Sequence, residues 1–76
     1  MRELIREKIA AFVNQPAIKI VDDRLLSDLV TESFLLVELV IELQEEFQAR
    51  LMQEDLRNVK TVGELISTVE SKRLEN

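Results

Sequence analysis

The chain has 76 residues and a formal net charge of −5, with 46% hydrophobic and 33% charged residues. This length suits one small globular domain, residues 1–76, and the composition is not that of a disordered chain. It contains neither Cys nor His, which excludes disulfides, thiolate metal sites and the commonest general base, and its acidic balance disfavours nucleic acids and anionic membranes.

The first segment predicts a helix from Arg2 to Asn14. Pro16 ends it, because proline lacks an amide hydrogen and pushes its predecessor out of the helical region. Apolar residues recur at three- and four-residue spacing, as one buried helix face requires: Ile5, Ile9 and Phe12, supported by Leu4 and Val13. The segment is charged throughout and has no apolar run of signal-peptide length, so we expect a cytoplasmic location.

Residues 16–32 have no sustained hydrophobic period and predict an unusually long loop. A short strand at residues 18–21 is one alternative, but no other run in the chain offers it a partner. A helical turn around residues 24–29 is the favoured alternative. Five apolar residues are expected to attach the segment to a core: Ile18, Ile20, Leu25, Leu26 and Leu29.

Residues 34–51 carry the strongest pattern in the chain and predict the second main helix. Five residues form a core stripe at 100° per residue: Leu36, Leu39, Val40, Leu43 and Phe47. The opposite face holds Phe34, Val37, Glu38, Ile41 and Glu45, with Glu42 and Glu46 along one flank.

The C-terminal third predicts a short helical turn at residues 53–58 and a last helix. Thr61 and Glu64 have the spacing of a capping box, in which each side chain accepts a hydrogen bond from the other residue's backbone amide. The core face of the last helix is expected to hold Val62, Leu65, Ile66 and Val69, and the tail from Ser71 to Asn76 is expected to fray. The fold class is therefore all-α, a small bundle of three main helices and one short helix with a long first loop.

The acidic residues of the second main helix have two interpretations. Glu38, Glu42 and Glu46 are four residues apart, which places like charges next to one another and destabilises an isolated helix. A solvated face is the ordinary interpretation, but an uncompensated acid row beside exposed apolar residues favours a docking surface for a basic protein. Acid–base catalysis by these exposed glutamates lacks a pocket, and the pair Asp22–Asp23 lacks the pattern of a calcium loop, so no metal is predicted.

Ser33 is the remaining candidate for chemistry. It lies where the long loop meets the acidic helix, so its hydroxyl is expected at the positive end of the helix dipole, where free amides favour a phosphate group. The structural alternative is that Ser33 is the N-cap of this helix. An enzyme with Ser33 as nucleophile would lack the general base that activates a hydroxyl.

The surroundings of Ser33 resemble the acyl carrier proteins. The family pattern is Asp-Leu-Gly-x-Asp-Ser-Leu, then x-x-Val-Glu-Leu-Val-x-x-Leu-Glu-Glu-Glu-Phe, and residues 28–47 read DLVTESFLLVELVIELQEEF without a gap. The resemblance is specific from Leu26 to Phe47 and weaker before Val21. It implies a four-helix bundle, not itself an enzyme, whose serine, here Ser33, receives 4'-phosphopantetheine from coenzyme A through a phosphopantetheinyl transferase.

The resemblance also implies which surface meets the partner enzymes. These would be a ligase or transferase that loads an acyl or aminoacyl group, and downstream enzymes with basic patches. The recognition residues would be Glu32, Phe34, Val37, Glu38, Ile41, Glu42 and Glu45. We expect the carrier to act as a monomer.

Four departures from the family pattern surround the serine. Glu32 replaces an aspartate, Val30 a glycine, Phe34 a leucine, and Leu35 an acidic residue. The more apolar surface favours a specialised fatty acid, polyketide or related pathway. The sequence from Ser33 onward also resembles the D-alanyl carriers, so an aminoacyl cargo is one alternative, and a helical interaction domain without an arm is another.

Overall fold

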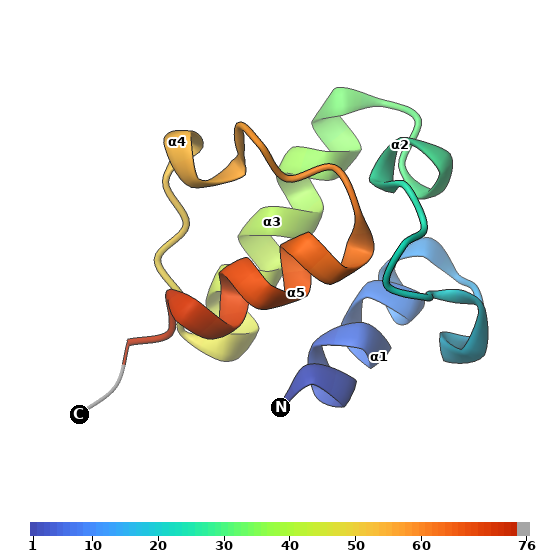
Figure 1. The fold of residues 1–76 in the computed structure, drawn as a ribbon, viewed down its shortest axis with the longest axis horizontal. Coiled ribbons are helices and arrows are strands. Elements are labelled where there is room, and N and C mark those ends of the chain that lie inside the picture. The colour runs from blue at the N-terminus through green and yellow to red at the C-terminus, as the bar shows by residue number, and fades with distance from the viewer. Residues whose placement is uncertain (75–76) are drawn as a thin grey trace.

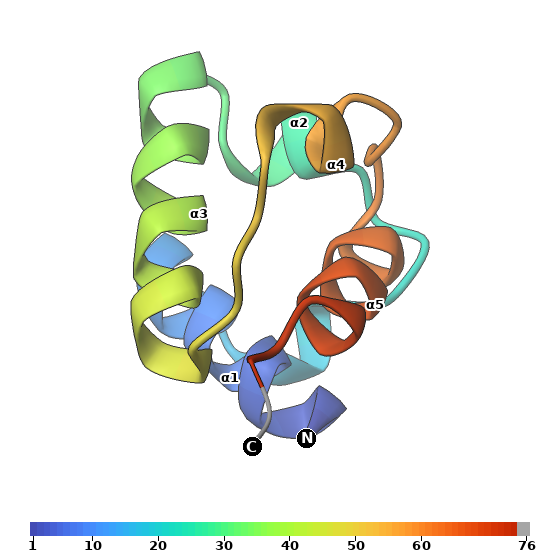
Figure 2. The same cartoon turned by 90° about the vertical axis from the view of Figure 1, so that its left-hand side faces the viewer.

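The computed structural model describes residues 1–74, which form helices and connecting loops without a β-strand. The three long helices are α1 (Arg2–Val13), α3 (Ser33–Phe47) and α5 (Val62–Ser71), and each packs against the other two (Figure 1). Two single-turn helices, α2 (Leu26–Leu29) and α4 (Gln53–Leu56), lie at the end of the bundle where α3 begins (Figure 2). The predicted all-α bundle is confirmed.

The core is built from the predicted stripes of the three long helices. Ile5 and Ile9 of α1 and Leu39 and Leu43 of α3 are completely buried. All four predicted core residues of α5 are also completely buried: Val62, Leu65, Ile66 and Val69. Leu4 does not belong to this core. Its side chain is 56% exposed at a surface hollow that it shares with Phe47 and Leu74, so that part of the prediction was wrong.

The first loop contains a 3₁₀ turn at Ala17–Lys19 and the helical turn α2, so the strand alternative was wrong and the favoured helical turn is confirmed. Ile20 and Leu26 are buried, and Leu29 is half-buried. Ile18 and Leu25 are exposed, contrary to the prediction. The segment is too short to enclose every apolar side chain, and Ile20 and Leu26 take the inward positions.

Backbone hydrogen bonds join this loop to the start of α5. The Val62 amide donates to the Arg24 carbonyl at 2.9 Å, and the Gly63 amide donates to the Asp22 carbonyl at 2.8 Å. A Cβ atom at Gly63 would lie 3.0 Å from the Asp22 Cβ. A larger residue at position 63 would therefore force the Asp22 segment to move by a few tenths of an ångström.

Helices α1 and α3 are each followed by a residue in the left-handed backbone region. Asn14 ends α1 with φ 58°, and Gln48 ends α3 with φ 51°. The prediction that the second main helix reaches Leu51 was wrong by four residues. After Gln48 the chain turns inward, and Ala49 and Leu51 are buried in the core.

The chain after α5 is held in place by the loop that follows α3. The Arg50 amide donates to the Lys72 carbonyl at 3.0 Å, and the Leu74 amide donates to the Gln48 carbonyl at 2.7 Å. The predicted fraying from Ser71 is therefore wrong as far as Leu74, because these backbone groups are paired. Residues 75 and 76 lie outside the described range.

The predicted capping box at the start of α5 is confirmed. The Glu64 amide donates to Thr61 Oγ1 at 3.2 Å, and the Thr61 amide donates to Glu64 Oε1 at 3.0 Å. The Lys60 amide donates to the same carboxylate oxygen at 2.8 Å. Hydrogen bonds from the Lys60 and Thr61 amides lower the pKa of Glu64.

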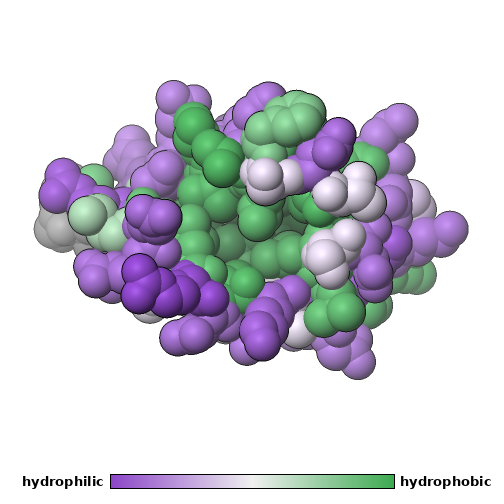
Figure 3. All heavy atoms as spheres, turned by 90° about the horizontal axis from the view of Figure 1, so that it is seen from above, coloured by the Kyte–Doolittle hydropathy of each residue, from purple (hydrophilic) through white to green (hydrophobic). Residues whose placement is uncertain are grey.

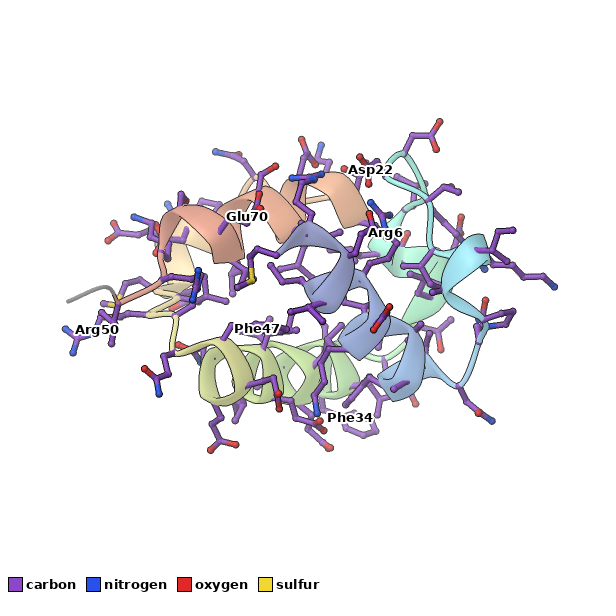
Figure 4. The ribbon with its side chains drawn as sticks, turned by 90° about the horizontal axis from the view of Figure 1, so that it is seen from below. Arg6, Asp22, Phe34, Phe47, Arg50 and Glu70 are labelled. Carbon is purple, nitrogen blue, oxygen red and sulfur yellow. The ribbon has the colours of Figure 1, made fainter. Side chains whose placement is uncertain are left out.

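A charged cluster connects α1, the first loop and α5. Asp22 accepts hydrogen bonds from Arg6 at 2.6 Å and from Arg2 at 3.2 Å, and Arg2 also pairs with Glu70 at 3.0 Å. Figure 4 shows Arg6 and Asp22 directed toward each other, with Glu70 on α5 nearby. The hydrogen bond from Arg6 is the main cause that lowers the pKa of Asp22 below its usual 3.8.

We expect the Asp22 carboxylate to make the free energy of unfolding decrease at acidic pH. Asp22→Asn should remove this part of the pH dependence. A carboxyl whose pKa is lowered by folding stabilises the folded state above its unfolded pKa, and this contribution is lost as the pH falls through the lowered value. Urea midpoints of the wild type and of Asp22→Asn should therefore differ at pH 7, begin to converge near the usual pKa of 3.8, and coincide once the pH is below the lowered value. A difference that stays constant down to pH 2 would contradict an ionic role for Asp22.

Candidate functional site

Ser33 is the first residue of α3, and its side chain is exposed. The N-cap is Glu32, which makes no side-chain cap hydrogen bond, so the alternative that Ser33 is the N-cap was wrong. The amides of Leu35 and Leu36 already donate to the Glu32 carbonyl, at 3.0 Å and 3.3 Å. Within residues 1–74, no acceptor faces the amides of Ser33 and Phe34, and these free donors lie at the positive end of a 15-residue helix.

Ser33 lies at the edge of an open groove of about 510 Å³. One wall comes from α2 and the residues around it, and the other comes from the segment that leads into α5. The lining residues are Leu25, Leu26, Ser27, Val30, Thr31, Ser33, Leu36, Val59 and Lys60. Figure 3, which views this end of the molecule, shows an apolar hollow at the centre with a mainly polar rim.

The two walls of this groove are joined by the backbone. The Leu26 amide donates to the Lys60 carbonyl at 2.9 Å, and Leu25 forms an isolated antiparallel bridge with Thr61. Leu26 and Val30 are buried and attach α2 to the core. The two walls are therefore held together where Leu25 and Leu26 meet Lys60 and Thr61.

Below the groove the interior is nearly filled. A residual apolar space of about 20 Å³ is lined by Leu26, Leu36, Val40, Leu56, Val59 and Leu65. Ligand pockets in proteins usually measure roughly 300–1,000 Å³. In this conformation the surface groove, and not the interior, has room for a chain attached to Ser33.

The outer face of α3 is exposed as predicted. Phe34 is 59% exposed, Val37 57% and Ile41 46%, and Figure 4 shows Phe34 pointing outward from α3 while Phe47 points inward. Glu32, Glu38 and Glu45 are exposed around these apolar residues. Leu35 differs from the prediction, because it is half-buried against the core and adds little to this face.

The prediction that the acid row along α3 is uncompensated was wrong for two of its residues, Glu42 and Glu46. Lys8 of α1 places its Nζ atom 3.4 Å from a carboxylate oxygen of Glu42 and 3.8 Å from one of Glu46. Helix periodicity cannot reveal this contact, because Lys8 belongs to a different helix. Glu38 and Glu45 form no ion pair with any described residue, so no cation of residues 1–74 competes with a partner for them.

Two structural observations concern other classes of site. Among residues 1–74 no three acidic side chains are grouped closely enough to hold a metal ion. None of the described helices is long and apolar enough to cross a membrane.

The arrangement around Ser33 fits a phosphodiester with a long substituent. The hydroxyl is accessible, two free amides and the helix dipole favour a negative charge beside it, and the groove accommodates the substituent. Sequence reasoning found Ser33 but not the second wall of the groove, Val59 and Lys60. The only signal for that wall was the position of these two residues directly before the capping box.

Comparisons with known proteins identify the same kind of site. The family model described as "Phosphopantetheine attachment site" matches residues 3–69. The acyl carrier protein of Thermotoga maritima is 31% identical over 72 residues, which cover 95% of this chain and 85% of that protein. The acyl carrier protein of Clostridium perfringens is 30% identical over 69 residues, which cover 91% of this chain and 87% of that protein.

Proposed function

This chain belongs to the acyl carrier protein family and has its phosphopantetheine attachment domain, and on this premise we propose that Ser33 Oγ carries the 4'-phosphopantetheine arm. The observation that supports this attachment point is the exposed Ser33 hydroxyl beside two free helix amides and an open groove. When bound, the arm supplies the thiol that this cysteine-free chain lacks, and acyl groups are carried on it as thioesters.

Ser33 acts in this proposal as an attachment point and not as a catalytic nucleophile. Its hydroxyl makes no hydrogen bond to an acidic or basic side chain of residues 1–74, so an activating base has to come from a transferase. The helix amides then stabilise the charge of the phosphodiester once it has formed. We therefore propose a non-catalytic carrier in which residues 1–76 act as one monomeric domain, and its cytoplasmic location stays a prediction.

The proposed cargo is an acyl intermediate of a specialised fatty acid, polyketide or related pathway. The exposed Phe34, Val37 and Ile41 support this choice, because a partner must cover an apolar surface as well as neutralise charge. The alternative cargo is an aminoacyl group, because the sequence from Ser33 onward also resembles the D-alanyl carriers.

Loading with coenzyme A tests the attachment directly. Incubation of the purified chain with coenzyme A, magnesium and several broadly tolerant phosphopantetheinyl transferases should add one arm per chain. Intact mass measures the product, and a known carrier protein serves as the control. If that control is loaded while this chain stays unmodified with every transferase, the carrier function is contradicted.

The outer face of α3 is the proposed docking surface for the transferase and the pathway enzymes. Glu38→Lys should slow loading by a transferase with a basic patch, because a rim charge mainly affects the association rate. Its effect on stability should be a few tenths of a kcal/mol, since the variant replaces a repulsive contact with Glu42 by an attractive one. Glu42 is unsuitable for this test because it pairs with Lys8.

The control for Glu38→Lys is Glu7→Lys, which makes the same charge change at an exposed position of α1. Loading rates are measured across a salt series. The defect of Glu38→Lys should shrink toward ~1 M salt, where the Debye length is roughly 3 Å, while Glu7→Lys should load like the wild type. Equal loading rates for all three proteins at low salt would show that Glu38 is an ordinary solvated residue and not part of the docking surface.

A further inference from the structure

Lys60 occupies a distinctive place in the groove beside Ser33. Of the described residues that line this groove, Lys60 alone is charged. Its backbone is fixed on both sides, because its carbonyl accepts from the Leu26 amide at 2.9 Å and its amide donates to Glu64 Oε1 at 2.8 Å. The residue is therefore held beside the first residue of α2, in the lining of the groove that also includes Thr31 and Ser33.

The ammonium group of Lys60 is exposed and forms no ion pair within 4.0 Å among residues 1–74. Its charge does act on the neighbouring Glu64, where it adds to the backbone hydrogen bonds that lower the pKa of that carboxyl. Glu64, the acidic residue bound to its backbone, already accepts hydrogen bonds from the amides of Lys60 and Thr61. A lysine head group on a flexible stem can therefore move toward an anion placed in the groove.

We propose that Lys60 is a positioning residue, whose ammonium binds the phosphodiester of the arm on Ser33 and turns the arm into the groove between α2 and the Val59–Lys60 segment. This inference rests on the proposed attachment of the arm to Ser33. The free amides of Ser33 and Phe34 approach the phosphodiester from the helix end, and Lys60 approaches it from the opposite wall. The apolar lining residues then face the substituent beyond the phosphate.

This contact separates two functions in space. The arm lies on the α5 side of Ser33, and the docking face formed by Phe34, Val37 and Ile41 lies on the outer side of α3. An enzyme can then bind α3 without first displacing the arm. Release of the arm into an active site then requires the enzyme to break the Lys60 contact and to draw the substituent away from the apolar lining of the groove.

The test compares the wild type with Lys60→Gln before and after loading, by amide chemical shifts and the ³¹P resonance. Lys60→Gln keeps both backbone hydrogen bonds and should fold normally. In the wild type, loading should shift the amides of Val59 and Lys60 as well as those of Ser33 and Phe34. In Lys60→Gln the shifts at residues 59 and 60 should be lost, while those at Ser33 and Phe34 persist.

Arg57→Gln is the matched control, since Arg57 is an exposed cation that follows α4 but does not line the groove. Its loading shifts should equal those of the wild type. In ~1 M salt, the wild-type shifts at residues 59 and 60 should shrink, because screening acts over roughly 3 Å.

Two results would overturn the Lys60 contact, and they differ in what else they overturn. If loading shifts the same amides by the same amount in the wild type and in Lys60→Gln, the contact is wrong and the attachment to Ser33 stands. If the arm is found at another residue or is never attached, both the attachment and the contact are wrong.

Discussion

Replacing Ser33 with alanine will abolish attachment of the arm and leave the fold intact. The substitution removes the hydroxyl of the first residue of α3. Because Glu32 and not Ser33 is the N-cap, the change in the free energy of unfolding should stay within about 0.5 kcal/mol, as for ordinary surface substitutions. Intact mass after incubation with coenzyme A and a transferase measures loading, and urea titration measures stability.

Ser27→Ala is the matched control, since Ser27 is a second exposed serine in the same groove. This variant should be loaded at the wild-type rate, because Ser27 lies inside α2, a helix of one turn that offers no comparable set of free amides. Loading of Ser33→Ala, or its loss in Ser27→Ala alone, would show that the attachment point has been assigned to the wrong serine.

Replacing Leu43 with alanine will remove a large part of the stability of the domain. Leu43 is completely buried on the inner face of α3, and truncation of such a leucine costs about 2–5 kcal/mol. A small protein has roughly 5–15 kcal/mol of stability in total, so this variant is expected to unfold at much lower urea.

Ile41→Ala provides the comparison on the same helix. Ile41 lies two residues away and is 46% exposed. Its replacement should therefore lower the free energy of unfolding by much less than Leu43→Ala does. Urea titrations of both variants measure the difference. Equal destabilisation would mean that the assignment of inner and outer faces on α3, and with it the proposed docking surface, is incorrect.

The sequence predicted the long helices well because their residues sample the helical period several times. In α3, Leu39, Leu43 and Phe47 are spaced by one turn, and all three are buried. The first loop lacks such a period, so Ile18 and Ile20 could not be distinguished, although one is 84% exposed and the other is fully buried. Their positions depend on how the loop packs against α1 and α5.

Other features depend on contacts between distant parts of the chain. The end of α3 at Phe47 is marked by Gln48, which adopts the left-handed conformation without the Gly or Asn that usually signals it. The segment after α5 is ordered as far as Leu74 through hydrogen bonds to the loop after α3. The Lys8 contacts to α3 likewise join residues more than thirty positions apart.

The candidate site was predictable in one half only. Ser33 stands out because its neighbours match a family pattern and because it precedes a strong helical stripe. The groove beside it could not be foreseen, because Val59 and Lys60 line the same groove as Ser33 only once the segment before α5 pairs with α2. No spacing along the chain encodes that pairing.

The most direct test of the proposed function is the mass of the protein recovered from its native host. Trypsin cleavage after Arg24 and Arg50 releases residues 25–50, which contain Ser27, Thr31 and Ser33. We predict that this fragment carries the mass of one phosphopantetheine arm, with or without cargo, and that fragmentation places it on Ser33. A native protein whose residues 25–50 are found entirely unmodified, or modified at a residue other than Ser33, would contradict the proposal.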